Sequence, residues 1–220
     1  MKPAEAYLFA YNAISLFGWG AILMKSLLLL SQGYSYSDTY TLVEPWLQIF
    51  QTTALLEIAH SLLRLVRSPL PTVLMQVYSR VTLVWLVLWK VGEARDSIGV
   101  PMILIAWSIT EVIRYSFYAL QLLGSGVPDF LVWARYSFFI LLYPIGASGE
   151  LFIMVRGLDE VDQKQHFSLH MPNALNFAFS FYAYLCFYML SYIYGFPKLY
   201  LLMFSLRKKV LCTDSAKKQK

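Results

Sequence analysis

Six long apolar stretches, separated by short polar breaks, set the pattern of this chain. A helix needs about 20 mostly apolar residues to cross the hydrocarbon core of a bilayer. The stretches of about this length are Tyr7–Leu30, Trp46–Leu63, Thr72–Trp89, Ile98–Leu120, Phe130–Val155 and Ala174–Tyr194. The pattern predicts an all-α integral membrane protein built as a bundle of six transmembrane helices.

The breaks contain residues that end helices. Glycine, serine or proline recur in three of them, Gln32–Asp38, Ser68–Pro71 and Gly124–Pro128. We expect the longest polar loop at Arg156–Asn173. A further apolar piece after Pro197 either extends the sixth span or lies in the membrane interface. No internal repeat marks the chain.

Composition agrees with a membrane location. Hydrophobic residues make up 58% of the chain and charged residues 14%, whereas a soluble domain carries about 25% charged residues. The net charge is +5, and six of the 18 Lys and Arg residues lie at or after Arg207. We therefore divide the chain into a membrane domain, residues 1–206, and a basic cytosolic tail, residues 207–220. The tail suits anionic membrane lipid, and no soluble basic domain is present to bind nucleic acid.

Basic residues also predict orientation, because loops rich in Lys and Arg remain in the cytosol. The tail places the C-terminus there, and six spans then place the N-terminus there too. Some positive charge falls on the lumenal side in this arrangement, at Lys90, Arg95, Arg156 and Lys164. Lys217 and Lys218 resemble a dilysine signal, which predicts residence in the endoplasmic reticulum.

Charged and polar residues inside the predicted spans are candidates for function, because burying them in a bilayer is costly. They fall at helical spacings in the pairs Glu57 and His60, Gln76 and Arg80, and Glu111 and Arg114. Such pairs either bind one another across the bundle or contact a ligand. The first has the spacing of half a di-iron site, but the second Glu-x-x-His is absent, so no metal is expected.

The fifth stretch combines a phenol, a proline and a carboxyl group. Tyr143 and Glu150 are seven residues apart, on one helix face and about 10.5 Å along its axis. Gly146 lies between them on that face, and Pro144 should kink the helix. Gly146 and Gly149 would leave room for a substrate. The pattern is consistent with a proton-transfer site, but taken alone it favours a structural tyrosine and a satisfied carboxyl beside a kink.

The run Tyr143-Pro-x-Gly-x-x-x-Glu150 resembles the signature of the very-long-chain (3R)-3-hydroxyacyl-CoA dehydratases, also called the protein-tyrosine-phosphatase-like A family. Four further segments resemble that family in the same order: Leu56-Glu-Ile-Ala-His60, Gln76-x-x-x-Arg80, Trp107-Ser-Ile-Thr-Glu-Val-Ile-Arg-Tyr115 and Met171-Pro-Asn-Ala-Leu-Asn176. The similarity covers the second to the sixth stretch.

The resemblance implies six spans, residence in the endoplasmic reticulum and the third step of fatty-acid elongation. That step removes water from (3R)-3-hydroxyacyl-CoA and leaves trans-2-enoyl-CoA. The family's catalytic pair corresponds to Tyr143 and Glu150, and no cofactor is required. Glu150 is provisionally the base and Tyr143 the acid. The implied partners are the acyl-CoA substrate and the other elongation enzymes, which are the elongase, the ketoacyl reductase and the enoyl reductase.

Substrate binding would divide between the bundle and its cytosolic end. The acyl chain would lie among the helices, and arginines near the cytosolic face could bind the phosphates of CoA. The candidates for contact with substrate are Arg64, Arg67, Arg80, Arg114, Arg135 and Gly146. Two other functions compete. A phosphatase-like scaffold would only bind, since no Cys is followed five residues later by Arg, and a small transporter often shows internal repeats.

Overall fold

The computed structural model describes residues 2–66, 68–124, 126–172 and 176–218, with side chains as far as residue 211. These residues form helices, and their one pairing of strand type is the isolated bridge between Leu169 and Phe179. The elements in order are α1 (Pro3–Ser31), α2 (Tyr36–Thr53), α3 (Leu55–Leu62), α4 (Leu70–Val81), the π-helix η1 (Thr82–Leu88), the 3₁₀ turn η2 (Glu93–Asp96), α5 (Gly99–Leu123), α6 (Asp129–Ser137), α7 (Phe139–Lys164) and α8 (Phe181–Lys218).

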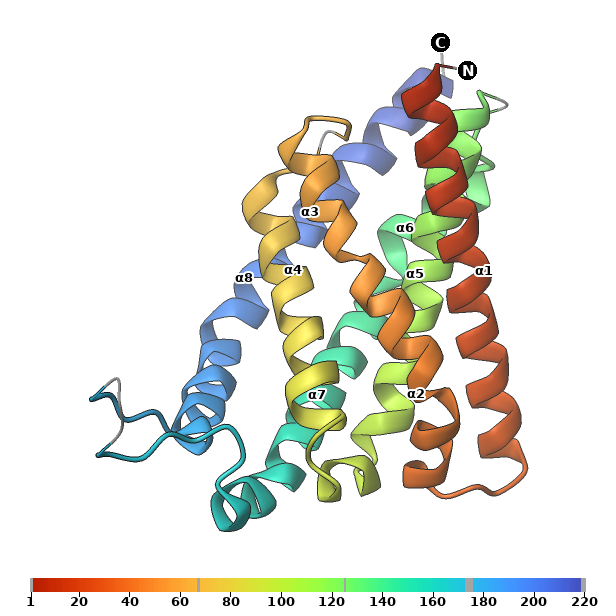
Figure 1. Cartoon of the computed structure of the whole chain (residues 1–220). Coiled ribbons are helices and arrows are strands. Elements are labelled where there is room, and N and C mark those ends of the chain that lie inside the picture. Colours follow the sequence, from red (N-terminus) through yellow and green to blue (C-terminus); the bar gives the residue numbers. More distant parts are fainter. Residues whose placement is uncertain (1, 67, 125, 173–175, 219–220) are drawn as a thin grey trace.

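The helical segments run up and down a single bundle (Figure 1). The α1 helix leads away from the end that carries the N-terminus, α2 and α3 return to it, and α4 leads away again. The α5 helix returns, α6 and α7 lead away, and α8 brings the chain back. Both chain termini therefore lie at the same end of the bundle.

Five helical segments in the described chain are long and apolar enough to cross a membrane: Pro3–Ser31, Leu70–Leu88, Gly99–Leu123, Phe139–Lys164 and Phe181–Leu211. Large apolar side chains face outward from them, such as Phe17, which is 81% exposed. Since a soluble monomer rarely exposes so much apolar surface, these side chains suit contact with lipid. The protein is an all-helical membrane protein.

The second predicted span is divided in the structure. It begins at Tyr36, ten residues before the predicted start, and breaks at Ala54 between α2 and α3. At the break the Glu57 N–H donates to the Ala54 carbonyl at 3.0 Å instead of to Thr53. The Thr53 carbonyl, freed in this way, accepts the Tyr11 hydroxyl at 3.3 Å. A side chain of α1 thus supplies the hydrogen bond that the Thr53 carbonyl lacks at the break.

The predicted boundaries of the last two spans were wrong. The α7 helix continues to Lys164, so the first half of the expected loop Arg156–Asn173 is helical. It continues because Glu160 bonds Lys164 one turn on, at 2.9 Å, and accepts the Glu93 N–H at 2.7 Å. The α8 helix begins only at Phe181 and runs through Pro197 without a break, so the apolar piece after that proline extends the helix.

The core lies where α5 packs between α1 and α7. The backbones of α5 and α7 meet at Gly99 and Gly149. A Cβ added to Gly99 would lie 2.2 Å from the Gly149 carbonyl oxygen, and one added to Gly149 would lie 2.9 Å from Met102 Cβ. These two glycines allow the close contact, and that contact fixes α7 against α5.

The α8 helix is the least embedded segment. Only 6% of its most apolar window is buried, against 50% in α5. It packs on α7 and α6, and it reaches α4 through side chains such as Tyr78, whose ring lies 6.4 Å from that of Tyr188. Its position therefore depends on a small number of specific contacts.

Candidate active site

Pro144 lies inside α7 and leaves one backbone carbonyl without its usual partner in the helix. The helix continues through this proline, and the interruption falls earlier, at Phe138 between α6 and α7. Because proline has no N–H, the Ile140 carbonyl one turn before it loses its helical partner. The Tyr200 hydroxyl of α8 donates to that carbonyl at 3.0 Å. The kink expected at Pro144 stays a prediction, and the freed Ile140 carbonyl provides a docking point for α8.

Both carboxyl oxygens of Glu150 accept hydrogen bonds. Trp107 of α5 donates from Nε1 to Oε1 at 3.3 Å, and Tyr192 of α8 donates from its hydroxyl to Oε2. An indole N–H can only donate, and an ionised carboxylate can only accept. This donor set therefore suits Glu150 in its ionised form.

Aromatic rings of α8 cover Tyr143. The Tyr143 ring is stacked on Phe196, with centroids 4.9 Å apart, and on Tyr200, with centroids 5.9 Å apart. The interplanar angles are 20° and 8°. Offset stacking of this kind fixes the plane of the phenol ring. Tyr143 and Glu150 therefore face the same stripe of α8.

Sequence reasoning missed this contribution of α8, because the sixth stretch carries no charge. A signal was nevertheless present. Aromatic residues recur at every fourth position, at Tyr184, Tyr188, Tyr192, Phe196, Tyr200 and Phe204. Residues four apart lie on the same side of a helix, so neighbouring members of this series lie one above the next. We call these six residues the aromatic ladder.

The two glycines near the pair have different surroundings. A Cβ on Gly146 would be 3.7 Å from Trp107, an ordinary contact distance. A Cβ on Gly149 would instead be 3.0 Å from the Gly99 carbonyl oxygen. The expectation that Gly149 leaves room for substrate was wrong, since the α5 backbone occupies that space. Gly146 faces Trp107, beside the carboxyl of Glu150.

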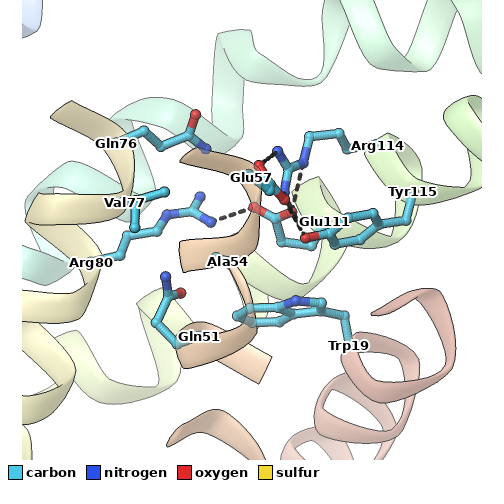
Figure 2. A pocket seen from close by; sticks show the side chains of 10 residues that line it. All are labelled: Trp19, Gln51, Ala54, Glu57, Gln76, Val77, Arg80, Glu111, Arg114 and Tyr115. Atoms are coloured by element: carbon cyan, nitrogen blue, oxygen red, sulfur yellow. Dashed lines mark hydrogen bonds and ion pairs between the residues drawn. The ribbon is translucent and has the colours of Figure 1, made fainter. Parts of the chain in front are cut away.

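A buried ion-pair network lies next to the site (Figure 2). Arg114 binds both oxygens of Glu57, at 2.6 and 2.7 Å, and also contacts Glu111 at 2.6 Å. Glu111 is 1% exposed and also pairs with Arg80. Tyr115 donates to Glu57 at 2.6 Å. Of the two alternatives for these residues, the structure shows pairing across the bundle, which joins α3, α4 and α5.

Arg80 links this network to the candidate site. Its guanidinium lies over the Trp107 ring, 4.9 Å from the centroid, and Trp107 in turn donates to Glu150. The pocket between the side chains of Figure 2 has a volume of about 10 Å³, room for about one water molecule. Arg80 and Arg114 are thus committed to glutamates in this conformation.

The other candidate arginines lie in different surroundings. Arg135 of α6 donates to the Tyr118 hydroxyl at 2.8 Å and lies over the Phe117 ring at 4.3 Å. Its Nη1 is buried without a hydrogen-bond partner. Arg64 is exposed in the connection from α3 to α4, with a φ of 55°. Arg67 lies outside the described residues.

Glu57 and His60 have other partners than a metal. His60 Nε2 is 2.9 Å from the Tyr7 hydroxyl, whereas Glu57 faces Arg114. Among the residues that the structure describes, no group of three or more His, Cys, Asp or Glu side chains could hold a metal ion.

Within the all-helical membrane bundle, Glu150 accepts two hydrogen bonds and Tyr143 stacks on two rings of α8, an arrangement that can transfer protons in an apolar setting. The chain belongs to the family described as protein tyrosine phosphatase-like protein, PTPLA, whose sequence model matches residues 51–213. The resemblance found in the motifs is thereby confirmed.

Curated relatives match nearly the whole chain. The very-long-chain (3R)-3-hydroxyacyl-CoA dehydratase hpo-8 of Caenorhabditis elegans is 52% identical over 98% of this chain and 99% of the relative. Human very-long-chain (3R)-3-hydroxyacyl-CoA dehydratase 2 is 43% identical over 98% and 85%. The Arabidopsis thaliana dehydratase PASTICCINO 2 is 38% identical over 94% and 93%. No solved structure matches this chain.

Proposed function

We propose that this protein removes water from very-long-chain (3R)-3-hydroxyacyl-CoA, with Tyr143 and Glu150 as its catalytic pair. The observation that supports the activity is the identity of 38–52% with dehydratases from worm, human and plant, over almost the full chain. The enzyme is a hydro-lyase of fatty-acid elongation, and nothing favours a scaffold or a transporter.

The reaction needs one base and one acid. The Glu150 carboxylate takes a proton from carbon 2, and the electrons of that bond form the double bond to carbon 3. The bond from carbon 3 to oxygen breaks, and the departing hydroxyl takes the phenolic proton of Tyr143 and leaves as water. The proton on Glu150 then returns to the Tyr143 oxygen, which restores both groups.

The hydrogen bonds of Glu150 support its assignment as the base. Trp107 and Tyr192 both donate to it, and this arrangement stabilises a carboxylate ready to accept a proton. The Tyr143 ring is held by stacking on Phe196 and Tyr200. Because these contacts involve the ring and not the hydroxyl, the hydroxyl is available to donate to the substrate. These different surroundings support the proposed assignment of Glu150 as the base and Tyr143 as the acid.

Substrate binding is proposed in two parts. The acyl chain lies among the helices beside Gly146, where the absence of a side chain removes bulk next to Trp107. The CoA phosphates bind at the end of the bundle that carries the termini, at Arg64 and Arg135. Arg67, which lies outside the described residues, stays a candidate from the sequence. Arg135 has a donor without a partner in this structure, and arginine suits phosphate. The sequence made Arg80 and Arg114 candidates for contact with substrate. In the structure they pair with glutamates, and we propose that they hold the helices around the site together.

Location and partners complete the proposal. The chain crosses the endoplasmic-reticulum membrane six times, with α2 and α3 together as the second crossing and both termini in the cytosol. Both termini lie at one end of the bundle (Figure 1), which an even number of crossings requires. The elongase, the ketoacyl reductase and the enoyl reductase are the proposed partners, because they make and consume the intermediates.

The direct test uses purified protein in detergent or lipid vesicles. We expect conversion of a very-long-chain (3R)-3-hydroxyacyl-CoA to the trans-2-enoyl-CoA, measured by mass spectrometry as the loss of one water. The (3S) substrate is the matched control and should remain unchanged. Absence of enoyl product from the (3R) substrate, with folded protein, would contradict the proposed activity.

A further inference from the structure

The aromatic ladder of α8 contacts both members of the catalytic pair. Two of its members, Phe196 and Tyr200, stack on Tyr143, and the member one turn earlier, Tyr192, donates to Glu150. Since α7 and α8 run in opposite directions (Figure 1), the order of contacts is reversed between the helices. One face of α8 thus touches the phenol and the carboxyl at the same time.

Tyr192 is well placed to fix the carboxyl group. Its hydroxyl donates to Glu150 Oε2 from α8, while Trp107 donates to Oε1 from α5. The carboxyl group is therefore held by donors from two different helices. Two donors at the two oxygens define both the position and the plane of the group, which a single donor would leave free to rotate.

The register of α8 decides where the Tyr192 hydroxyl lies. Two hydrogen bonds fix that register toward the C-terminal part of the helix. Tyr200 donates to the Ile140 carbonyl at 3.0 Å, the acceptor that Pro144 leaves open, and Arg207 Nε donates to Ser137 Oγ at 3.2 Å. Because little of α8 is otherwise buried, its position along α7 depends strongly on these two hydrogen bonds.

We propose that Tyr192 is a positioning residue of this enzyme, which holds the Glu150 carboxylate in the orientation needed to take the proton from carbon 2. The inference rests on the proposed role of Glu150. Tyr192 acts through that carboxylate and need not touch the substrate. The hydrogen bond from Tyr200 to the Ile140 carbonyl holds α8 against α7, and this places the Tyr192 hydroxyl at the Glu150 carboxylate.

The test is Tyr192→Phe, which keeps the ring and removes the hydroxyl. A hydrogen bond to a charged group contributes enough free energy to predict a fall in kcat of about 10- to 100-fold. KM should stay within about twofold, because substrate contacts are retained. The matched control is Tyr194→Phe on the same helix. Tyr194 is 73% exposed, and its variant should keep wild-type kcat.

A second experiment distinguishes positioning of Glu150 by Tyr192 from a merely structural role of Tyr192. In Glu150→Asp the carboxylate ends one methylene short of the Tyr192 hydroxyl, so adding Tyr192→Phe should lower kcat little further. If the two changes instead multiply, or if Tyr192→Phe alone keeps wild-type kcat, Tyr192 does not position Glu150. Wild-type protein without dehydratase activity would instead contradict the proposed function, which the first assay detects separately.

Discussion

At the scale of single residues, the site depends on what surrounds two side chains. Tyr143 is held by aromatic rings and Glu150 by two hydrogen-bond donors. Neither takes part in the ion-pair network, although Arg80 lies next to Trp107. The proposed acid and base, Tyr143 and Glu150, can therefore be changed without disturbing the charges that join the helices, which makes them suitable for conservative substitution.

We expect Tyr143→Phe and Glu150→Gln each to lower kcat by about 10²- to 10⁴-fold, the usual contribution of acid–base groups. Tyr143→Phe keeps the ring that stacks on Phe196 and Tyr200, so the variant should fold. Turnover at saturating (3R)-3-hydroxyacyl-CoA, normalised to folded protein, is the measurement. Tyr34→Phe, an exposed tyrosine in the turn after α1, is the control. Near wild-type turnover of either catalytic variant would make that residue structural.

At the scale of elements, two kinds of contact hold the helices together. Glycines bring α5 and α7 into backbone contact, and buried ion pairs join α5 to α3 and α4. The first kind depends on shape and the second on charge. Each can be tested with a variant that removes only one of them.

Gly149→Ala should destabilise the bundle by about 1–3 kcal/mol, because the added methyl group meets the α5 backbone. Gly20→Ala is the matched control, since nothing lies within 4 Å of a Cβ at Gly20, and it should not lower stability. Thermal unfolding in detergent, followed by circular dichroism, measures both. Equal melting temperatures for the two variants would show that α5 and α7 tolerate a wider spacing.

Glu57→Gln should cost about 3–5 kcal/mol, the usual effect of removing one partner of a buried ion pair. The loss leaves Arg114 with only Glu111 to balance its charge. The double variant Glu57→Gln with Arg114→Gln should be less destabilised than the sum of the two single variants, because it removes both charges. Additive losses in the melting temperature would show that the pair is not coupled.

At the scale of the whole molecule, the arrangement of the bundle determines the access of substrate and the exposure of the termini. Both termini lie at one end (Figure 1), together with the connection that contains Arg64. The opposite end holds the turn after α1 and the segment between α7 and α8. An enzyme oriented in this way would receive the CoA head group from the side of its termini.

Epitope tags at the two termini should both be digested by protease when only the plasma membrane is permeabilised. The reason is the basic tail, which begins at Arg207 and favours the cytosol. The control is a lumenal marker protein, which must stay protected until detergent dissolves the internal membranes. Protection of one tag would mean an odd number of crossings, and protection of both would mean the reverse orientation.

The sequence by itself predicted the class of protein, and the family resemblance of its motifs implied Tyr143 and Glu150 as the expected catalytic pair. Long apolar stretches predict membrane helices, and the spacing of Tyr143 and Glu150 places them on one helix face, because both signals repeat within a single element. The motifs also indicated the family, which the relatives then confirmed. Element boundaries were less accurate, since the break at Ala54 depends on a contact from Tyr11.

Only the tertiary structure decided which side chains meet. Tyr192 lies 42 residues after Glu150, and Arg114 lies 57 residues after Glu57. No local pattern encodes such pairs, because they depend on the packing of whole helices. The sixth stretch carries no charge, and the four-residue spacing of its aromatic residues does not show which side chains of other helices they contact. The close contact of Gly99 with Gly149 is equally a property of two packed backbones, and it makes Gly149 a packing residue rather than part of a substrate passage.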